Sequence, residues 1–150
     1  MLYGLAILIG IIAGLRAVMP LAAISWGAWL GWIDLSATPF AFMGHIIAVI
    51  ILTLLAIAEL VSDQLPNTPS RKVPMQFGTR IVLGAAAGAL LMPTSWLIGA
   101  LLGAIGAVVG TFAGAEIRGL LARAFGRDLP AALIEDVVAI GGAFLIVYLA

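Results

Sequence analysis

The longest uncharged stretch of the chain sets the first limit on its fold. Residues 81–115 contain no Asp, Glu, Lys or Arg, and Pro93 lies near the middle of this stretch. A helix needs about 20 apolar residues to cross the hydrocarbon core of a bilayer, so these 35 residues are too many for one crossing and barely enough for two. Because proline breaks a helix, we expect a short helix over about 77–91 and a longer helix over about 96–117.

Three other segments are apolar enough to enter a membrane. Residues 2–19 carry Arg16 as their only charge and end at Pro20, residues 40–61 form the cleanest span, and residues 131–150 form the last one. Each is close to the length that a membrane-crossing helix needs. We therefore expect a chain that enters the bilayer repeatedly.

The first of these segments cannot continue straight into the residues that follow it. A helix over residues 2–33 would measure about 48 Å, against about 30 Å for a hydrocarbon core. We expect a bend at Pro20. Tryptophans at every third position from 26 to 32 share one helix face and suit the lipid headgroups, so residues 21–33 are predicted to be interfacial or re-entrant.

Together these segments predict an all-α, polytopic helical membrane protein. We expect a single integral membrane domain over residues 1–150 with about five transmembrane helices and with Pro-broken or re-entrant segments near Pro20 and Pro93. A charged content of 9% supports this class, because soluble domains carry about 25%.

Short elements recur in the same order along the chain. The pairs Gly-Xaa-Arg, Met-Pro, Ser-Trp and Ala-Glu repeat at offsets of 64, 73, 70 and 57 residues. The chain therefore has two alternative interpretations. It consists of two degenerate repeats, over about 1–66 and 74–130, followed by a C-terminal helix over 131–150, or the short matches arise by chance. Paired broken helices in two repeats would point to a transporter binding site, and the loop positions would make this repeat a parallel one.

The basic residues assign an orientation. Two polar loops, at 62–76 and 118–130, are bordered by six of the seven basic residues, namely Arg71, Lys72, Arg80, Arg118, Arg123 and Arg127. Positive charge is retained in the cytoplasm. With five crossings we expect both loops and the N-terminus in the cytoplasm and the C-terminus outside, in a bacterial inner membrane.

Composition excludes several classes of function. Seven basic and seven acidic residues cancel, so no basic field exists to hold nucleic acid, and membrane lipids are the expected partners. The chain has no cysteine and one histidine, which excludes thiol catalysis and cysteine-based metal sites. We expect no metal and no cofactor.

Charges within the predicted spans are the main functional candidates, because such charges usually line cavities or pair with one another. Glu59 and Asp63 are four residues apart and share a helix face. Asp63 and Arg80 could instead extend toward water at the membrane surface without a functional role. Arg16 and Glu59 could instead form a buried ion pair that stabilises the fold. The predicted substrate or ion pathway consists of Arg16, Glu59, Asp63, Arg80 and Glu116.

Three other polar residues have simpler explanations. Glu135 and Asp136 open the last predicted helix, where the positive end of the helix dipole favours acids. We expect them to stabilise the helix start. His45, alone in an apolar segment, is expected to be hydrogen bonded to a neighbour.

A stripe of small residues predicts close helix packing. Glycines recur every three or four residues in the fourth span, and such stripes let backbones approach closely in lipid. We expect this face to pack against another helix of the same chain or of a second copy, which would make a homo-oligomer. The stripe consists of Gly99, Gly103, Gly106, Gly110 and Gly114, with partner faces at Gly84, Gly88, Gly141 and Gly142.

The loop at 62–76 has groups that bind phosphate. Amides, hydroxyls and two cations there could bind a lipid headgroup or a phosphorylated solute, and the same residues also occur in ordinary loops. The phosphate-binding candidates are Asn67, Ser70, Arg71 and Lys72. No Walker loop, zinc motif or nucleophile elbow is present, so the sequence favours an enzyme less than a transporter.

Several motifs resemble those of an uncharacterised family of small bacterial multi-pass membrane proteins, the domain of unknown function family four-one-two-six. The segments that carry the resemblance are residues 14–20, Ala58-Glu59-Leu60, Asp63-Gln64-Leu65-Pro66, Pro69-Ser70-Arg71, Gly78-Thr79-Arg80 and the glycine-rich helix. The resemblance covers nearly the whole chain and implies a multi-pass protein of the bacterial inner membrane. It implies no substrate and no catalytic residue.

Three functions follow as hypotheses. The first is a transporter or channel-like protein for a small solute, ion or lipid, with its polar site between broken helices. The second is an enzyme or binding protein acting on a phosphorylated lipid at the cytoplasmic face. The third is a structural or accessory subunit that packs through the glycine stripe. We rank transport first, because 150 residues with one compact polar loop leave little room for separate catalytic machinery.

Overall fold

The computed structural model describes residues 1–63 and 73–150, and these residues form helices and turns without a strand. The all-α expectation is confirmed. The helices are α1 (Leu2–Leu15), α2 (Met19–Leu30), α3 (Ile46–Ser62), α4 (Pro74–Leu91), α5 (Trp96–Phe125) and α6 (Asp128–Leu149), with short 3-10 turns at Ala41–Gly44 and Pro93–Ser95.

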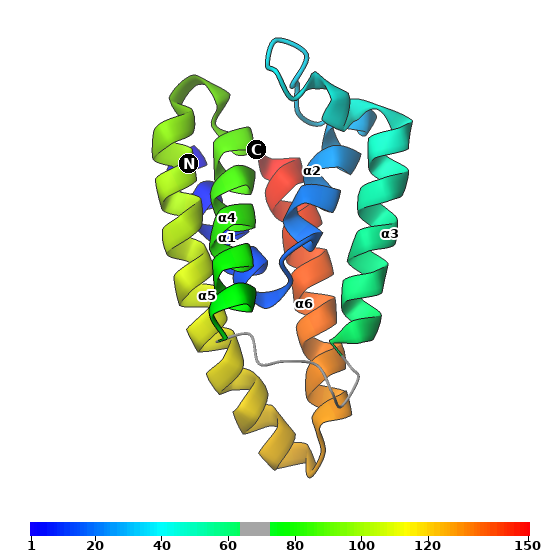
Figure 1. The fold of residues 1–150 in the computed structure, drawn as a ribbon, viewed down its shortest axis with the longest axis vertical. Helices are drawn as coiled ribbons and strands as arrows, with labels where there is room; N and C mark the ends of the chain where they lie inside the picture. Colours follow the sequence, from blue (N-terminus) through cyan, green and yellow to red (C-terminus); the bar gives the residue numbers. More distant parts are fainter. Residues whose placement is uncertain (64–72) are drawn as a thin grey trace.

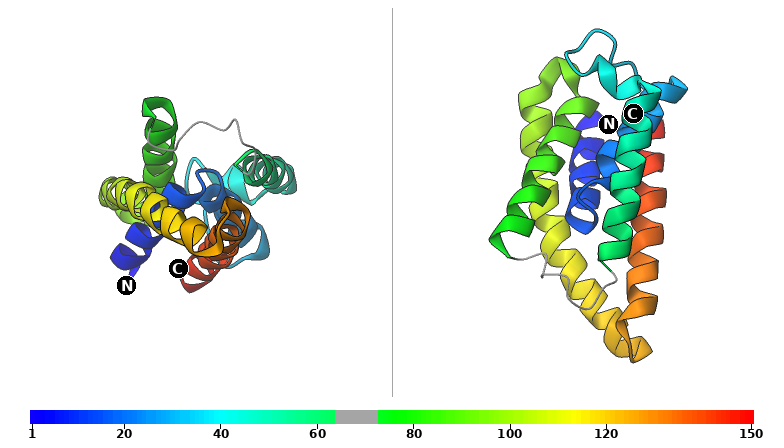
Figure 2. Two further views of the ribbon diagram at one scale, coloured as in Figure 1. Left: turned by 90° about the horizontal axis from the view of Figure 1, so that it is seen from below. Right: turned by 45° about the vertical axis from the view of Figure 1, so that its right-hand side comes forward.

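Successive helices run in opposite directions along one long bundle (Figure 1). α1 runs inward from the N-terminus, α2 returns, and α3 to α6 continue the alternation until the C-terminus. Both termini lie at one end of the bundle, and the turn between α5 and α6 lies at the other end, as Figure 1 and the right-hand view of Figure 2 show. α1 and α2 therefore form a hairpin whose two outer ends lie at the same end of the bundle.

This hairpin corrects the predicted path of the N-terminal segment. Residues 2–19 do not cross the bundle as one helix, and the N-terminus lies opposite the 118–130 turn rather than beside it. The helix ends before Arg16, which is extended with φ −141° and ψ 112°. Pro20 lies in the first turn of α2, where its missing N–H costs nothing, so it starts a helix instead of ending one.

The first two helices are shorter than a membrane-crossing helix. α1 has 14 residues and α2 has 12, or about 21 and 18 Å at 1.5 Å per residue, too short for a 30 Å core. Two helices, Pro93–Phe125 and Asp128–Leu149, are long and apolar enough to cross a membrane. The five predicted crossings are therefore not confirmed by the lengths of the described helices.

The predicted break near Pro93 is confirmed, and the fifth helix is longer than expected. α4 ends at Leu91, and a 3-10 turn leads into α5. α5 continues past residue 117 to Phe125 and stops at Gly126, whose φ of +76° is the left-handed conformation that ends helices. The last two turns of α5 therefore project beyond the ends of α3 and α4 (Figure 1).

α5 packs against α4 through glycines. A Cβ added at Gly103 would lie 2.1 Å from the carbonyl oxygen of Gly84, and one added at Gly88 would lie 2.1 Å from that of Gly99. At these positions the α4 and α5 backbones lie too close together to admit a side chain larger than hydrogen.

α1 is the second partner of the stripe, which the sequence did not indicate. A Cβ at Gly106 would lie 2.1 Å from the carbonyl oxygen of Ile7, and one at Gly110 would lie 2.2 Å from that of Ile11. The glycine face of α5 is thus covered by α1 and α4. An oligomer of this chain would have to use another surface.

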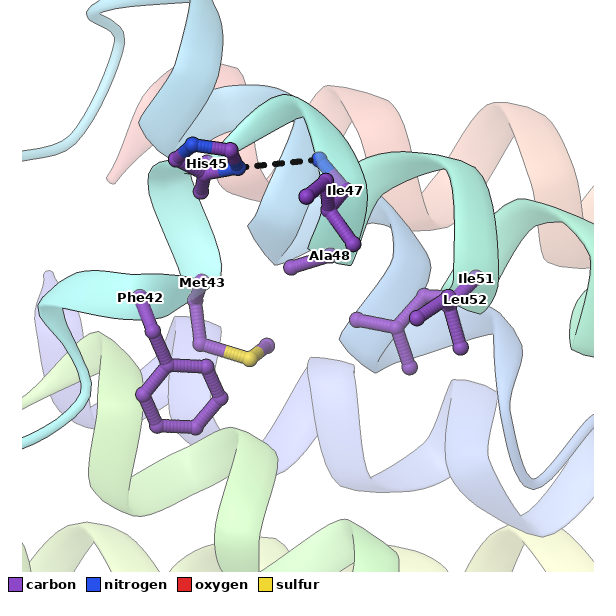
Figure 3. Close-up of a pocket in the computed structure, with 7 residues that line it drawn as sticks. All are labelled: Phe42, Met43, His45, Ile47, Ala48, Ile51 and Leu52. Carbon is purple, nitrogen blue, oxygen red and sulfur yellow. Dashed lines mark hydrogen bonds between the residues drawn. The ribbon is translucent and has the colours of Figure 1, made fainter.

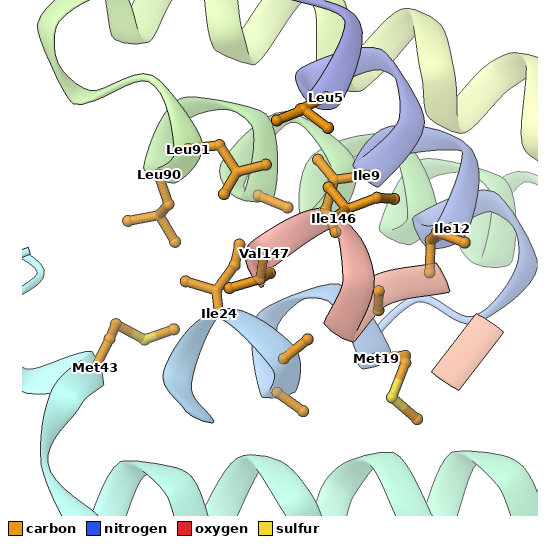
Figure 4. Packing of buried hydrophobic residues seen from close by; sticks show 14 of the residues in the cluster. Leu5, Ile9, Ile12, Met19, Ile24, Met43, Leu90, Leu91, Ile146 and Val147 are labelled. Carbon is orange, nitrogen blue, oxygen red and sulfur yellow. The ribbon is translucent and has the colours of Figure 1, made fainter. Parts of the chain in front are cut away.

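The apolar core lies between the hairpin and α4 and α6 (Figure 4). α2 is part of it, since Ala23 and Ile24 are fully buried. The labelled members in Figure 4 are Leu5, Ile9, Ile12, Met19, Ile24, Met43, Leu90, Leu91, Ile146 and Val147.

The outer surface is also apolar. α3 exposes Ile47, Ile51 and Leu54 by 60%, 52% and 61%, and α6 exposes Val137 by 71%. Such an extended apolar surface is unusual for a monomer in water and is typical of a lipid or protein contact.

Matched glycine-to-alanine substitutions test the packing of the stripe. Gly106→Ala should lower the thermal unfolding temperature in detergent, because its Cβ would collide with the α1 backbone at Ile7. Gly141→Ala is the control, because a Cβ there meets nothing within 4 Å. Alanine favours a helix over glycine by about 1 kcal/mol, so this variant should have a higher thermal unfolding temperature than wild type. A Gly106→Ala protein at least as stable as wild type would contradict this packing.

Candidate functional site

The connection between α1 and α2 lies inside the bundle and contains a buried charge. We call this connection, residues 16–18, the elbow. The Arg16 side chain is 1% exposed, and no apolar surrounding would tolerate an unpaired guanidinium. The elbow therefore depends on the acids around it.

Three carboxylates bind the Arg16 guanidinium. Nη1 lies 2.7 Å from Oε1 of Glu135 and 3.0 Å from Oδ2 of Asp63, and Nε donates to Oδ1 of Asp136 at 2.8 Å. Nη2 also contacts Oδ1 of Asp136, and Nη1 donates to the carbonyl oxygen of Leu15. One planar cation thus joins α3 and α6 to the end of α1, in the fork geometry that arginine provides.

Glu59 holds the other side of the elbow. Its Oε1 accepts the backbone N–H of Ala17 at 2.6 Å, and its Oε2 accepts that of Val18 at 2.8 Å. Amides at a helix start have no partner within the helix. A carboxylate from α3 therefore supplies the cap that α2 lacks in its own sequence.

A second buried arginine completes the arrangement. Arg80, in the second turn of α4, is 3% exposed. Its Nη1 donates to the carbonyl oxygen of Gly14 at 2.9 Å, and its Nη2 lies 4.0 Å from Oδ2 of Asp63. We call Arg16, Glu59, Asp63, Arg80, Glu135 and Asp136 the charge cluster.

Arg118 connects the charge cluster to the projecting end of α5. Its Nε and Nη2 donate to the two carboxylate oxygens of Asp128, at 3.1 and 2.7 Å, and Nη2 also reaches the carbonyl oxygen of Asp63 at 3.3 Å. This arginine therefore joins α5, the start of α6 and the end of α3 beside the cluster.

Four of the five predicted pathway residues meet in the cluster, and one does not. Arg16, Glu59, Asp63 and Arg80 converge, whereas Glu116 is exposed on α5. The reason is helix phase: residue 116 is two positions, about 200°, past the buried Gly114. A matching Ala-Glu pair in the sequence did not imply a matching position in the fold.

Glu135 and Asp136 have a different role from the one that the sequence predicts. They were expected to stabilise a helix start, but α6 begins at Asp128, so they lie about two turns inside it, beyond the reach of the helix dipole. A sequence signal existed, because Asp136, Ala139 and Ala143 follow the three- and four-residue spacing of a buried helix face.

The remaining predicted residues lie elsewhere. Nδ1 of His45 accepts the N–H of Ile47 at 3.1 Å and caps α3, as expected of a lone histidine. The phosphate-binding candidates Asn67, Ser70, Arg71 and Lys72 lie outside the described residues.

Two apolar hollows lie at the end of the bundle that holds the termini, away from the cluster. One, of about 370 Å³, is lined by Phe42 and Met43 facing Ile47, Ala48 and Leu52 (Figure 3). The other, of about 590 Å³, lies between residues 35–40 and the α4–α5 turn. Neither is lined by an acidic or basic side chain other than His45.

The arrangement of acids does not suit a metal ion. Within residues 1–63 and 73–150, no group of three or more His, Asp or Glu side chains is placed to bind one. The acids of the charge cluster face arginine and backbone amides instead.

Comparison with known proteins gives one match. The sequence profile of a family described as Domain of unknown function (DUF4126) matches residues 3–149. No curated protein and no solved structure matches the chain.

Removal of the Arg16 guanidinium tests the cluster. Arg16→Gln should lower the free energy of unfolding by about 3–5 kcal/mol, because it leaves buried carboxylates without their cation. Arg123→Gln removes an exposed arginine of α5 and should change stability by less than about 0.5 kcal/mol. Equal stability of the two variants, measured by denaturant unfolding in detergent, would show that Arg16 does not organise the cluster.

Proposed function

The chain belongs to the DUF4126 family, and because a domain of unknown function brings no activity with it, we propose one from the geometry. The protein is a small integral membrane transporter or channel-like protein. Its polar site is the charge cluster at the tip of the α1–α2 hairpin, and its cargo is a small solute, an ion or a lipid.

The observation that carries this proposal is the buried Arg16 with three carboxylates inside a bundle whose surface is apolar. Ionisable groups within membrane segments are costly and typically mark substrate, ion or proton pathways. Two arginines and four acids are far more than one structural ion pair requires.

The re-entrant hairpin supports the same function. Irregular backbone at membrane depth occurs where it is buried in protein or lines a cavity. Here the end of α1 and the start of α2 both meet the cluster, through the Gly14 carbonyl and the amides of Ala17 and Val18. Transporters commonly place their binding sites at such broken helices.

The proposed membrane arrangement has four crossings, by α3 to α6, and one re-entrant hairpin. Arg118, Arg123 and Arg127 lie at the α5–α6 end, which the positive-inside rule assigns to the cytoplasm. Both termini then face outward, in what we propose is a bacterial inner membrane.

The other two hypotheses gain less support. The lipid-enzyme hypothesis depends on Asn67, Ser70, Arg71 and Lys72, which lie outside the described residues. The accessory-subunit hypothesis depends on the glycine stripe, which α1 and α4 already cover.

Reconstitution tests transport. Liposomes with wild-type protein should exchange trapped potassium, chloride, amino acids, sugars or a fluorescent phospholipid faster than empty liposomes, measured by electrodes, mass spectrometry and fluorescence quenching. Arg16→Lys keeps the charge but loses the fork that binds three carboxylates, and should reduce this exchange to the level of empty liposomes. Arg123→Lys is the matched control and should behave as wild type. Wild-type vesicles that exchange nothing would contradict the proposal.

Single cysteines test the orientation, because the natural chain has none. Gly126→Cys should react with an impermeant maleimide only from the cytoplasmic side. Asp34→Cys and Ala150→Cys, at the end that holds both termini, should react only from outside. Labelling of positions 126 and 150 from the same side would exclude this arrangement.

A further inference from the structure

We propose that Glu59 is the proton-binding group of the charge cluster, so that the ion bound and moved at this site is H⁺. This inference rests on the proposed transport function and deepens it. It starts from a difference between Glu59 and the other three acids of the cluster.

The four carboxylates are held in two different ways. Asp63, Glu135 and Asp136 each face the Arg16 guanidinium, at 3.0, 2.7 and 2.8 Å. Glu59 is held by the neutral backbone amides of Ala17 and Val18. Among the described residues, it is therefore the one acid of the cluster that is hydrogen bonded to uncharged groups and not to Arg16.

This difference decides which acid can gain a proton. Protonation of an acid that faces Arg16 replaces a direct ion pair with that guanidinium by a weaker, neutral hydrogen bond, which costs free energy. Protonation of Glu59 leaves the Arg16 pairs intact, because an amide N–H carries no net charge that would be left uncompensated.

The charged groups around Glu59 act in both directions. Asp63, one turn further along α3, disfavours a second negative charge, whereas Arg80 from α4 favours it. From the elbow, Arg16 faces the cluster with its charge shared among Asp63 and the two α6 acids, Glu135 and Asp136. Charges of opposite sign thus act on Glu59 from α3 and from α4.

Proton uptake would also change the elbow. An ionised Glu59 accepts two amides with two oxygens, whereas a protonated carboxyl has one carbonyl oxygen free to accept and one O–H that donates. One amide at the start of α2 then loses its partner. Proton binding is therefore linked to loosening of the hairpin that holds Arg16, which gives a transporter a means of coupling.

Infrared difference spectroscopy of the full chain in lipid nanodiscs, between acidic and neutral pH, tests the proton site without a transport assay. Wild type should show the C=O stretch of a protonated carboxyl. Glu59→Gln should lose this band, and Glu59→Asp, which keeps a protonatable group, should retain it. Glu116→Gln makes the same substitution at an exposed position of α5 and should leave the band unchanged. A band that survives in Glu59→Gln would overturn the inference.

Proteoliposomes with a trapped pH-sensitive dye supply the second measurement. A potassium diffusion potential should drive proton entry with wild type and Glu116→Gln, and Glu59→Gln should fall to the rate of empty liposomes. Exchange of other trapped solutes without proton entry and without the band would overturn the inference and leave the transport proposal standing. A Glu59 band without exchange of any kind would overturn the transport proposal and leave the proton site standing.

Discussion

The need to neutralise one buried guanidinium organises this fold. Arg16 interrupts the first helix at a depth where an apolar bundle offers no water, and burial of its charge is tolerated only with acids at hydrogen-bond distance. Three acids from two other helices meet that need. The positions of α3 and α6 relative to the hairpin follow from this pairing.

Glycine packing makes the pairing geometrically accessible. Because Gly106 and Gly110 let α5 approach the α1 backbone, and Gly103 lets it approach α4, the three helices pack closely enough to bring Gly14 and Arg80 within a hydrogen bond. Helix capping then adds the remaining contacts: Glu59 for the amides of α2 and Arg80 for a carbonyl of α1. The same backbone groups that a broken helix leaves without partners thus draw charged side chains into the centre of the bundle.

Local patterns in the sequence were sufficient for the helical class, the break near Pro93, the close packing of the glycine stripe and four members of the cluster. These depend on composition and spacing within one segment. The direction of α1, the exposed position of Glu116 and the role of Glu135 and Asp136 depend on where helices begin and which face turns inward. The break lies at Arg16 rather than Pro20 because a proline fits the first turn of a helix. Because α2 then returns along the bundle, the N-terminus lies at the end opposite the α5–α6 turn.

The two halves of the chain contribute to the charge cluster in similar ways, which relates to the internal repeat considered from the sequence. α1 to α3 contribute Arg16, Glu59 and Asp63, and α4 to α6 contribute Arg80, Glu135 and Asp136, so each half gives one arginine and two acids. The corresponding helices run in opposite directions, since α1 runs toward the cluster and α4 runs away from it (Figure 1). A parallel repeat is therefore not what the structure has. Arg16 follows the end of α1 and Arg80 lies near the start of α4, so two helices that run in opposite directions bring their arginines to one site from opposite termini.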